Sequence, residues 1–125
     1  MSGSITFTIP NLPPSINALY QINFHRRTVS LKPEVQVWKT DAKQYIPAWS
    51  PREGSIVRAD VIVRLPWYCL NGKLKRQDVQ NFLKPLLDVI TERQGWDDSR
   101  AKFGSWGSVD CEEKSVEVTL SNVEV

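Results

Sequence analysis

The stretch Lys75-Arg76-Gln77-Asp78-Val79-Gln80-Asn81-Phe82-Leu83-Lys84 brings basic, acidic, amide and apolar residues together. Asp78 and Gln80 are two positions apart, and in an extended segment such residues point to the same face. In a helix they would not face each other. We therefore predict that residues 76–80 are extended and that a helix begins near Asn81. This spacing directs two oxygen ligands toward one point.

An amphipathic helix is predicted to follow this stretch. Pro85 fits best in a first helical turn, where its missing N–H costs little, so the helix is expected to begin late or to bend there. Gly95 is expected in the left-handed conformation after the last turn, followed by a hydrophobic contact from Trp96. Asp97 and Asp98 then open a loop or the next strand. Apolar residues at helical spacing predict one apolar stripe. They are Phe82, Leu83, Leu86, Leu87 and Ile90.

Oxygen-bearing side chains at the two ends of this helix suit a hard cation. Asp78, Gln80 and Asp98 offer the ligands that Mg²⁺ and Mn²⁺ prefer, and water and substrate phosphate complete the shell of Mg²⁺. Asp97 is a further candidate ligand. Lys84 lies one turn into the helix, where it would hold a phosphate oxygen. The ordinary alternatives are a helix cap for the first group and a solvated turn for the two aspartates after the glycine.

The whole string resembles the RusA family of Holliday junction resolvases. That family carries Asp-x-Asp-Asn-x-x-Lys, a helix, and then a glycine-led Asp-Asp. The corresponding residues are Asp78-Val79-Gln80-Asn81-Phe82-Leu83-Lys84, then Asp88, then Gly95-Trp96-Asp97-Asp98. The family's proline-rich opening is matched by Leu12-Pro13-Pro14-Ser15-Ile16-Asn17, and its later Arg-Thr-x-Ser by Arg27-Thr28-Val29-Ser30. The resemblance runs from about Ile5 to the last strand.

The resemblance implies a homodimeric α+β protein and a Mg²⁺-dependent endonuclease that resolves Holliday junctions in DNA recombination and repair, with Mn²⁺ as an alternative cofactor. Gln80 departs from the family, which has an aspartate there. A glutamine carbonyl can ligate a hard cation but brings no charge. One alternative is therefore a junction-binding protein that keeps the fold and has lost catalysis, and another is a protein-binding domain whose helix stripe is an interface. The implied catalytic residues are Asp78, Asp98 and Lys84, and the implied metal ligands are Asp78, Gln80, Asp98 and Asp97.

Basic residues gather in two parts of the sequence, at residues 25–32 and at residues 73–76, directly before Asp78. Basic residues beside acidic ones suit a phosphodiester nuclease, because the former hold backbone phosphates while the latter hold the metal. Solvated surface charges are the ordinary alternative for either cluster, and a turn bonded to its own backbone is the ordinary role of Asn17. The residues predicted to contact four-way junction DNA are Asn17, Arg26, Arg27, Lys73, Lys75, Arg76 and Asn81.

Length and composition indicate one folded domain, residues 1–125. The chain has 41% apolar and 24% charged residues, which is typical of a globular protein. Its net charge of +2 does not by itself indicate a nucleic-acid partner. Cys69 and Cys111 lack metal-ligand spacing, and no signal peptide or apolar run of membrane length is present. We therefore expect a cytoplasmic protein with reduced thiols and no membrane partner.

The remaining pattern predicts a mixed β-sheet with two main helices, an α+β fold. Alternating residues predict strands at residues 4–9, 55–66 and 115–120. A short strand near residues 102–106, interrupted by Gly104 and Gly107, is expected to form a hairpin with the last strand. Ile62 interrupts the polar face of the second strand, so that face is expected to be partly covered.

Other segments are less regular. Residues 33–48 predict a helix that Pro47 and Pro51 end. Residues 18–32 predict a loop with an aromatic and basic tip, and residues 67–74 a loop with a turn at Asn71-Gly72. Helical spacing predicts four core residues on the first helix. They are Val35, Trp38, Ala42 and Tyr45.

The predicted positions of Asp78 and Asp98 raise a geometric problem. They flank a helix of about 13 residues, whose ends lie roughly 20 Å apart at ~1.5 Å rise per residue. One metal ion cannot bridge that distance. Either the chain doubles back beyond Asp98, or the helix is shorter, or the site is shared across a dimer in which two such helices pack antiparallel, with the apolar stripe serving that contact. A four-way junction is two-fold symmetric and needs paired cuts, which fits two symmetric sites.

Overall fold

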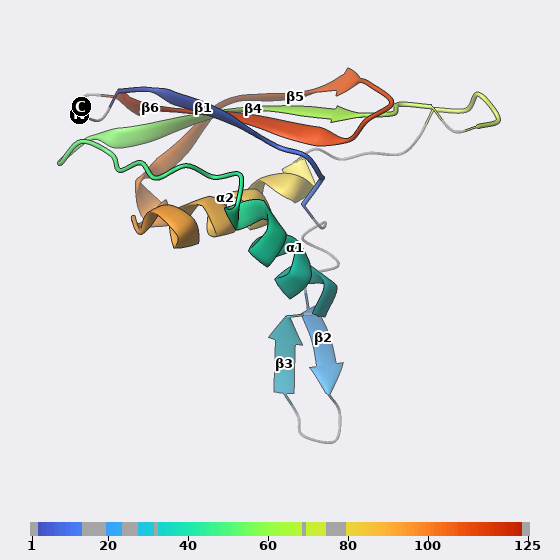
Figure 1. Cartoon of the computed structure of the whole chain (residues 1–125), viewed down its shortest axis with the longest axis horizontal. Coiled ribbons are helices and arrows are strands. Elements are labelled where there is room, and N and C mark those ends of the chain that lie inside the picture. The colour runs from blue at the N-terminus through green and yellow to red at the C-terminus, as the bar shows by residue number, and fades with distance from the viewer. Residues whose placement is uncertain are drawn as a thin grey trace.

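The computed structural model describes residues 3–13, 20–23, 28–31, 33–68, 70–74 and 80–123. These residues form a four-stranded mixed sheet, two α-helices and a separate two-stranded ribbon (Figure 1). The predicted α+β class is confirmed. In chain order the elements are β1 (Ile5–Ile9), β2 (Tyr20–Asn23), β3 (Thr28–Leu31), α1 (Pro33–Lys43), β4 (Ile56–Leu65), α2 (Gln80–Gln94), the 3₁₀ turn η2 (Asp98–Arg100), β5 (Ala101–Asp110) and β6 (Ser115–Val123).

The four strands of the main sheet lie in the order β1-β6-β4-β5. β6 pairs antiparallel with both β1 and β4, whereas β5 pairs in parallel with β4. The predicted hairpin between β5 and β6 is therefore wrong. The physical reason is the crossover through α2, which returns the chain so that β5 runs parallel to β4, on the side of β4 that β6 does not occupy.

β5 is longer than predicted and continues through both of its glycines. A Cβ on Gly104 would overlap the guanidinium group of Arg58. That guanidinium lies 3.2 Å from the carboxylate of Asp60, which also accepts a hydrogen bond from the Ser105 hydroxyl at 2.8 Å. The pairing register shifts at this point, before Asp60. Gly104 thus makes room for a neighbouring side chain and does not end the strand.

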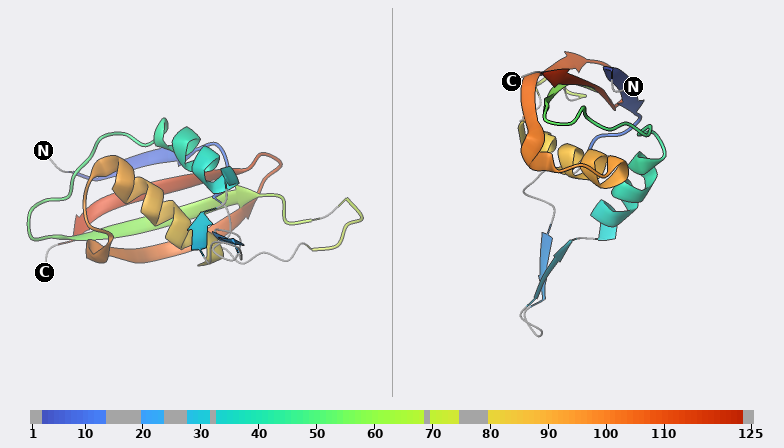
Figure 2. Two further views of the ribbon diagram at one scale, coloured as in Figure 1. Left: turned by 90° about the horizontal axis from the view of Figure 1, so that it is seen from below. Right: turned by 90° about the vertical axis from the view of Figure 1, so that its left-hand side faces the viewer.

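Both helices cover one face of the sheet, and the hydrophobic core lies between the two layers (Figure 2). Three residues of the predicted stripe, Leu83, Leu86 and Ile90, are buried in this core, and Leu87 packs half-buried against it. These residues pack within their own chain and do not form the dimer contact or protein interface that were the alternatives, whereas Phe82 is half-buried. The buried residues of α2 are Leu83, Pro85, Leu86, Val89 and Ile90, and those of β4 and β6 are Val57, Ala59, Val61, Val63, Leu65, Val116, Val118 and Leu120.

The other face of the sheet is open among the described residues. Arg64 on β4 pairs with Glu117 on β6 at 3.2 Å, and the hydroxyls of Thr6 and Thr119 lie 2.9 Å apart. Ile62 is 38% exposed on this face. The expected cover over Ile62 is thus not formed by the described part of the chain.

α1 ends about one turn before the predicted end. The next three backbone N–H groups bond to carbonyls three residues earlier, which tightens the chain after the helix. As a result Ile46 enters the core at 2% exposure, while Tyr45, a predicted core residue, is 44% exposed. The other predicted core residues agree with the structure, since Val35 and Ala42 are buried and Trp38 packs half-buried against the core.

α2 begins at Gln80, so Pro85 lies inside the helix and the late start predicted from this proline is wrong. Pro85 is buried, so its ring adds apolar surface on the side that faces the sheet. The predicted end is confirmed. Gly95 has φ +79°, its N–H donates to the Thr91 carbonyl at 2.7 Å, and Trp96 is buried beside it.

β2 and β3 form an antiparallel ribbon that projects away from the sheet and helices (Figures 1 and 2). The loop predicted over residues 18–32 is therefore wrong at residues 20–23 and 28–31. The register pairs Tyr20 with Leu31 and Ile22 with Val29. Each strand is only four residues long, so its alternation was too short to stand out from irregular sequence. The predicted tip at Arg26 and Arg27 lies outside the described residues.

Glu92 links α2 to α1. Its carboxylate lies 2.7 Å from Lys39 Nζ and 3.3 Å from Lys43 Nζ. Partial burial disfavours ionisation of Glu92, but the hydrogen bonds and charges of the two lysines outweigh burial and hold its pKa below the ordinary value of 4.5. The unfolded chain therefore binds this proton more tightly than the folded chain. The resulting stability is present above pH 4.5 and is lost as the pH falls through the lower pKa of the folded state.

We expect Glu92→Gln to lower the free energy of unfolding at neutral pH by about 0.5–1 kcal/mol, since solvent screens a pair of this kind. The Glu92 side chain is 45% exposed, which supports the small value. The difference from the wild type should shrink as the pH is lowered toward about 3. Urea unfolding at several pH values measures it, with Glu113→Gln on the exposed turn after β5 as the charge control. A difference that stays constant with pH would contradict this role of Glu92.

Candidate functional site

The structure describes six of the twelve predicted site residues. Those outside the described residues are Asn17, Arg26, Arg27, Lys75, Arg76 and Asp78. The described ones are Lys73, Gln80, Asn81, Lys84, Asp97 and Asp98. They fall into two groups at opposite ends of α2, with Lys73 on the loop that precedes the helix.

The first turns of α2 carry Gln80, Asn81 and Lys84. Gln80 is exposed and Asn81 is half-buried. The Nζ atom of Lys84 lies 3.6 Å from Asp88 Oδ1, and the Lys84 side chain is 58% exposed. An exposed ion pair at this distance is weak, so Lys84 can turn toward an approaching phosphate. The positive end of the helix dipole at the start of α2 favours the same kind of ligand.

Asp97 and Asp98 lie just past the other end of α2 and differ in what they do. Asp97 caps η2, because its Oδ1 accepts the Ser99 backbone N–H at 2.9 Å. This bond holds the pKa of Asp97 below its ordinary value of 3.8. Asp98 is exposed. Since Asp97 already commits one oxygen to the cap, Asp98 is the better candidate ligand of the two.

Arg100 braces the turn that carries Asp98. Its guanidinium group donates to the Ser55 carbonyl at 2.9 and 3.2 Å and to the Arg52 carbonyl at 2.8 Å. The start of β5 is thereby tied to the segment that leads into β4. Asp98 consequently stands on a turn whose position relative to the sheet is fixed.

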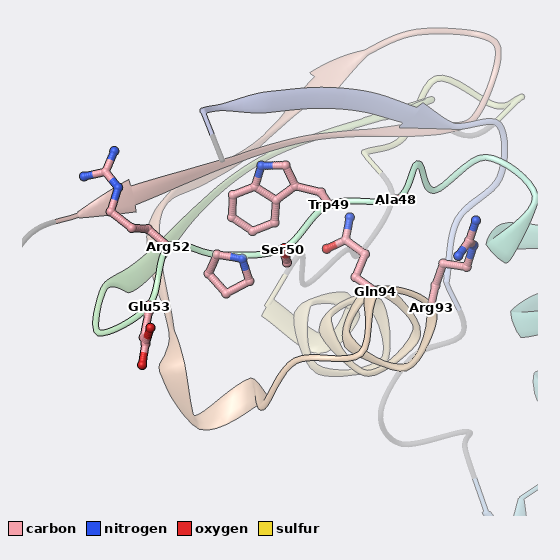
Figure 3. A pocket seen from close by; sticks show the side chains of 8 residues that line it. Ala48, Trp49, Ser50, Arg52, Glu53, Arg93 and Gln94 are labelled. Carbon is pink, nitrogen blue, oxygen red and sulfur yellow. The ribbon is translucent and has the colours of Figure 1, made fainter. Parts of the chain in front are cut away.

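A hollow of about 740 Å³ lies beside this turn, between residues 48–53 and the last turn of α2 (Figure 3). The indole ring of Trp49 faces it and packs edge-on against Trp96, with ring centroids 6.3 Å apart. Arg52 and Arg93 stand on either side of Trp49 (Figure 3). Neither arginine was predicted from sequence, because they come from segments that no local motif joins. The hollow is therefore lined by one aromatic ring and by two basic residues from separate segments.

The two groups of candidate residues do not meet within one chain. α2 has 15 residues, so its ends lie roughly 20 Å apart at ~1.5 Å rise per residue. The helix is therefore not shorter than predicted, and η2 leads directly into β5 without doubling back. Among the described residues, which do not include Asp78, no three His, Cys, Asp or Glu side chains group closely enough to hold a metal ion. Carboxylate and amide oxygens suit Mg²⁺, but Gln80 and Asp98 of one chain cannot share an ion.

The chain was compared with protein-family models and with curated proteins. No protein-family model matches the chain, and no curated protein matches it. Within the part of the chain that the structure describes, no helix has the length and apolar character needed to cross a membrane. The class that the structure defines is an α+β domain with a four-stranded mixed sheet and two helices on one face.

Proposed function

We propose that this protein is a Mg²⁺-dependent endonuclease that resolves four-way DNA junctions as a homodimer. The observation that carries the proposal is the order of residues about α2. Asp78, Gln80 and Lys84 stand at its start, and the glycine-led Asp97-Asp98 stands just past its end. This is the arrangement by which the sequence resembles the RusA resolvases, and α2 spans Gln80–Gln94 between the two groups.

A site shared between two subunits accounts for the separation of the two groups. An antiparallel contact that brings Asp78 level with Asp98 of the partner subunit also brings Lys84 level with Glu92 of the partner subunit. Both side chains are accessible on the chain surface, at 58% and 45% exposure. Asp88 would meet its own copy on the axis, but each Asp88 already lies beside Lys84 of its own chain. Such a two-fold contact forms two equivalent sites.

Each shared site would combine Asp78 and Gln80 from one subunit with Asp98 from the other, and Asp97 would assist. When bound, Mg²⁺ or Mn²⁺ supplies an activated water and stabilises charge on the leaving oxygen. Lys84 stabilises charge on the phosphate. The basic residues hold the DNA backbone, so their contribution should weaken as the salt concentration rises. These residues are Arg26, Arg27, Lys73, Lys75 and Arg76.

Mixing two inactive variants tests the shared site. We expect Asp78→Asn and Asp98→Asn to be inactive alone and to recover nicking when mixed, because a mixed dimer keeps one site with both aspartates. If subunits exchange freely in an equal mixture, about half of the dimers are mixed, so nicking should return to roughly a quarter of the wild-type rate. Gel assay of junction nicking measures the recovery, and native mass spectrometry verifies the mixed dimers. No recovery in a mixture that contains them would contradict sharing.

A second candidate is a junction-binding protein without catalysis. Gln80 favours it, because glutamine brings no charge to a position where the resembling family has an aspartate. This candidate predicts equal, structure-selective junction binding with and without Mg²⁺, and no nicks. Binding and cleavage assays on one labelled junction separate the two candidates.

A further inference from the structure

The loop between β4 and α2 carries exposed apolar side chains at residues 67–74, here called the apolar loop. Tyr68 is 53% exposed, Leu74 is 68% exposed and Leu70 is fully exposed. None of these three side chains belongs to the hydrophobic core. Figures 1 and 2 show that the loop extends past the end of the sheet, away from both helices. Exposed apolar side chains that come together on one projecting loop mark a candidate contact site for a partner.

The base of the apolar loop is fixed to the domain. The Trp67 side chain packs half-buried against the core. The backbone N–H of Trp67 donates to Asp110 Oδ1, at the end of β5, at 2.9 Å. Tyr68 and Leu74 then face each other in an antiparallel bridge, so the two arms of the loop are joined just beyond its base.

The tip of the apolar loop is fixed by the turn that the sequence predicts. Asn71 Oδ1 accepts the backbone N–H of Lys73 at 3.1 Å. Gly72 has φ +83°, a conformation that favours glycine, and this closes the turn. Leu70 and Leu74 therefore flank a defined turn. Because this turn is held by its own hydrogen bond, less conformational entropy is lost when the two leucines meet a partner.

The charge around the apolar loop indicates the chemistry of that partner. Residues 66–76 include Lys73, Lys75 and Arg76 and no acidic residue. Apolar groups beside cations fit an anionic partner that also exposes flat apolar surface. Nucleic acid offers both, as phosphates and as base faces. A continuous duplex hides its base faces by stacking, whereas an open branch point leaves some of them uncovered.

We propose that the apolar loop seats Leu70 and Leu74 against unstacked bases at the branch point of a four-way junction, with Tyr68 beside them. This inference rests on the proposed function and identifies what makes it selective for branched DNA. Apolar wedges inserted into a duplex must first unstack its bases, and that cost is smallest where bases are already unpaired or unstacked. Asp78 follows Leu74 by only four positions, so a seated loop brings the candidate catalytic stretch to the phosphates near the branch.

The double variant Leu70→Ser with Leu74→Ser tests the proposal. Its affinity for a four-way junction, measured by fluorescence anisotropy in Ca²⁺, should fall by about tenfold or more, while affinity for a continuous duplex changes by less than about twofold. A 2-aminopurine at the branch point should brighten when the wild type binds and not when the double variant binds. Both leucines are exposed, so the melting temperature should stay unchanged. Val37→Ser, at a 69% exposed site on α1, is the matched control and should alter neither affinity.

The outcomes separate this inference from the function on which it rests. Equal junction affinity of the wild type and the double variant overturns the role of the apolar loop and leaves junction resolution standing. A wild type that binds no junction at low salt overturns both. A double variant that sediments as a monomer where the wild type is a dimer overturns the inference in favour of a contact between copies.

Lys73→Gln should weaken junction and duplex binding alike and reduce the slope of log affinity against log salt by about one.

Discussion

Replacement of Asp98 by asparagine is expected to slow Mg²⁺-dependent nicking of a four-way junction by about 100- to 1,000-fold, with little change in junction affinity. Asparagine keeps the size of the side chain but removes the charge that would hold the cation. A loss of about 3–4 kcal/mol of transition-state stabilisation corresponds to this range. Asp98 is exposed, so the fold should not change. Initial nicking rates at saturating protein, with binding measured in Ca²⁺, give the two quantities separately.

Asp97→Asn is the matched control for Asp98→Asn. Asp97 caps η2 through the Ser99 N–H, and an asparagine oxygen accepts the same bond. The control should therefore keep the turn and lose much less activity. If Asp98→Asn nicks the junction at a rate within about twofold of the wild type, Asp98 is an ordinary turn residue. If both variants lose the same share of the nicking rate, the two aspartates share the ligand role.

Leu86→Ala is expected to lower the free energy of unfolding by about 2–5 kcal/mol, because it leaves a cavity in the core. Leu86 is 1% exposed and lies in the middle of the buried side of α2. A loss of this size is a large share of the ~5–15 kcal/mol that stabilises a typical domain. Urea unfolding followed by tryptophan fluorescence measures it.

Repeating the unfolding measurement at several protein concentrations tests whether Leu86 packs within its own chain or against a second subunit. If Leu86 packs within its own chain, the loss of stability is the same at low and high protein concentration. If the free energy of unfolding falls only at high protein concentration, the apolar stripe lies in a subunit interface. Val37→Ala, on the exposed side of α1, should change stability by less than about 0.5 kcal/mol and serves as the control.

Local sequence patterns predicted both helices and the strands of the main sheet, but they missed β2 and β3 and predicted the strand pairing wrongly. The stripe and Gly95 located the body and the end of α2, and strict alternation located β4 and β6. The partners of β6 could not be predicted in this way, because β6 pairs with β1 and β4, which are distant in sequence, and not with the neighbouring β5. Gly104 likewise looked like an interruption, since its role depends on Arg58 of the neighbouring strand.

The sequence predicted which residues belong to the candidate site but only part of their arrangement in space. The predicted helix already separated the two groups of candidate residues, and α2 keeps Gln80 and Asp98 at opposite ends as expected. The capping bond of Asp97 depends on the 3₁₀ turn, whose three residues carry no periodic signal. The hollow around Trp49 joins segments that are distant in sequence, and only the packing of α2 against residues 48–53 creates it.

Cleavage of a synthetic mobile four-way junction by the wild type and by Asp78→Asn, with Mg²⁺ or Mn²⁺, tests metal-dependent resolution most directly. We predict paired symmetric nicks from the wild type and their loss in Asp78→Asn, which should still bind the junction. Binding without nicks by the wild type would contradict the enzyme and favour the junction-binding protein that Gln80 indicates. Unchanged nicking by Asp78→Asn would remove Asp78 from the site.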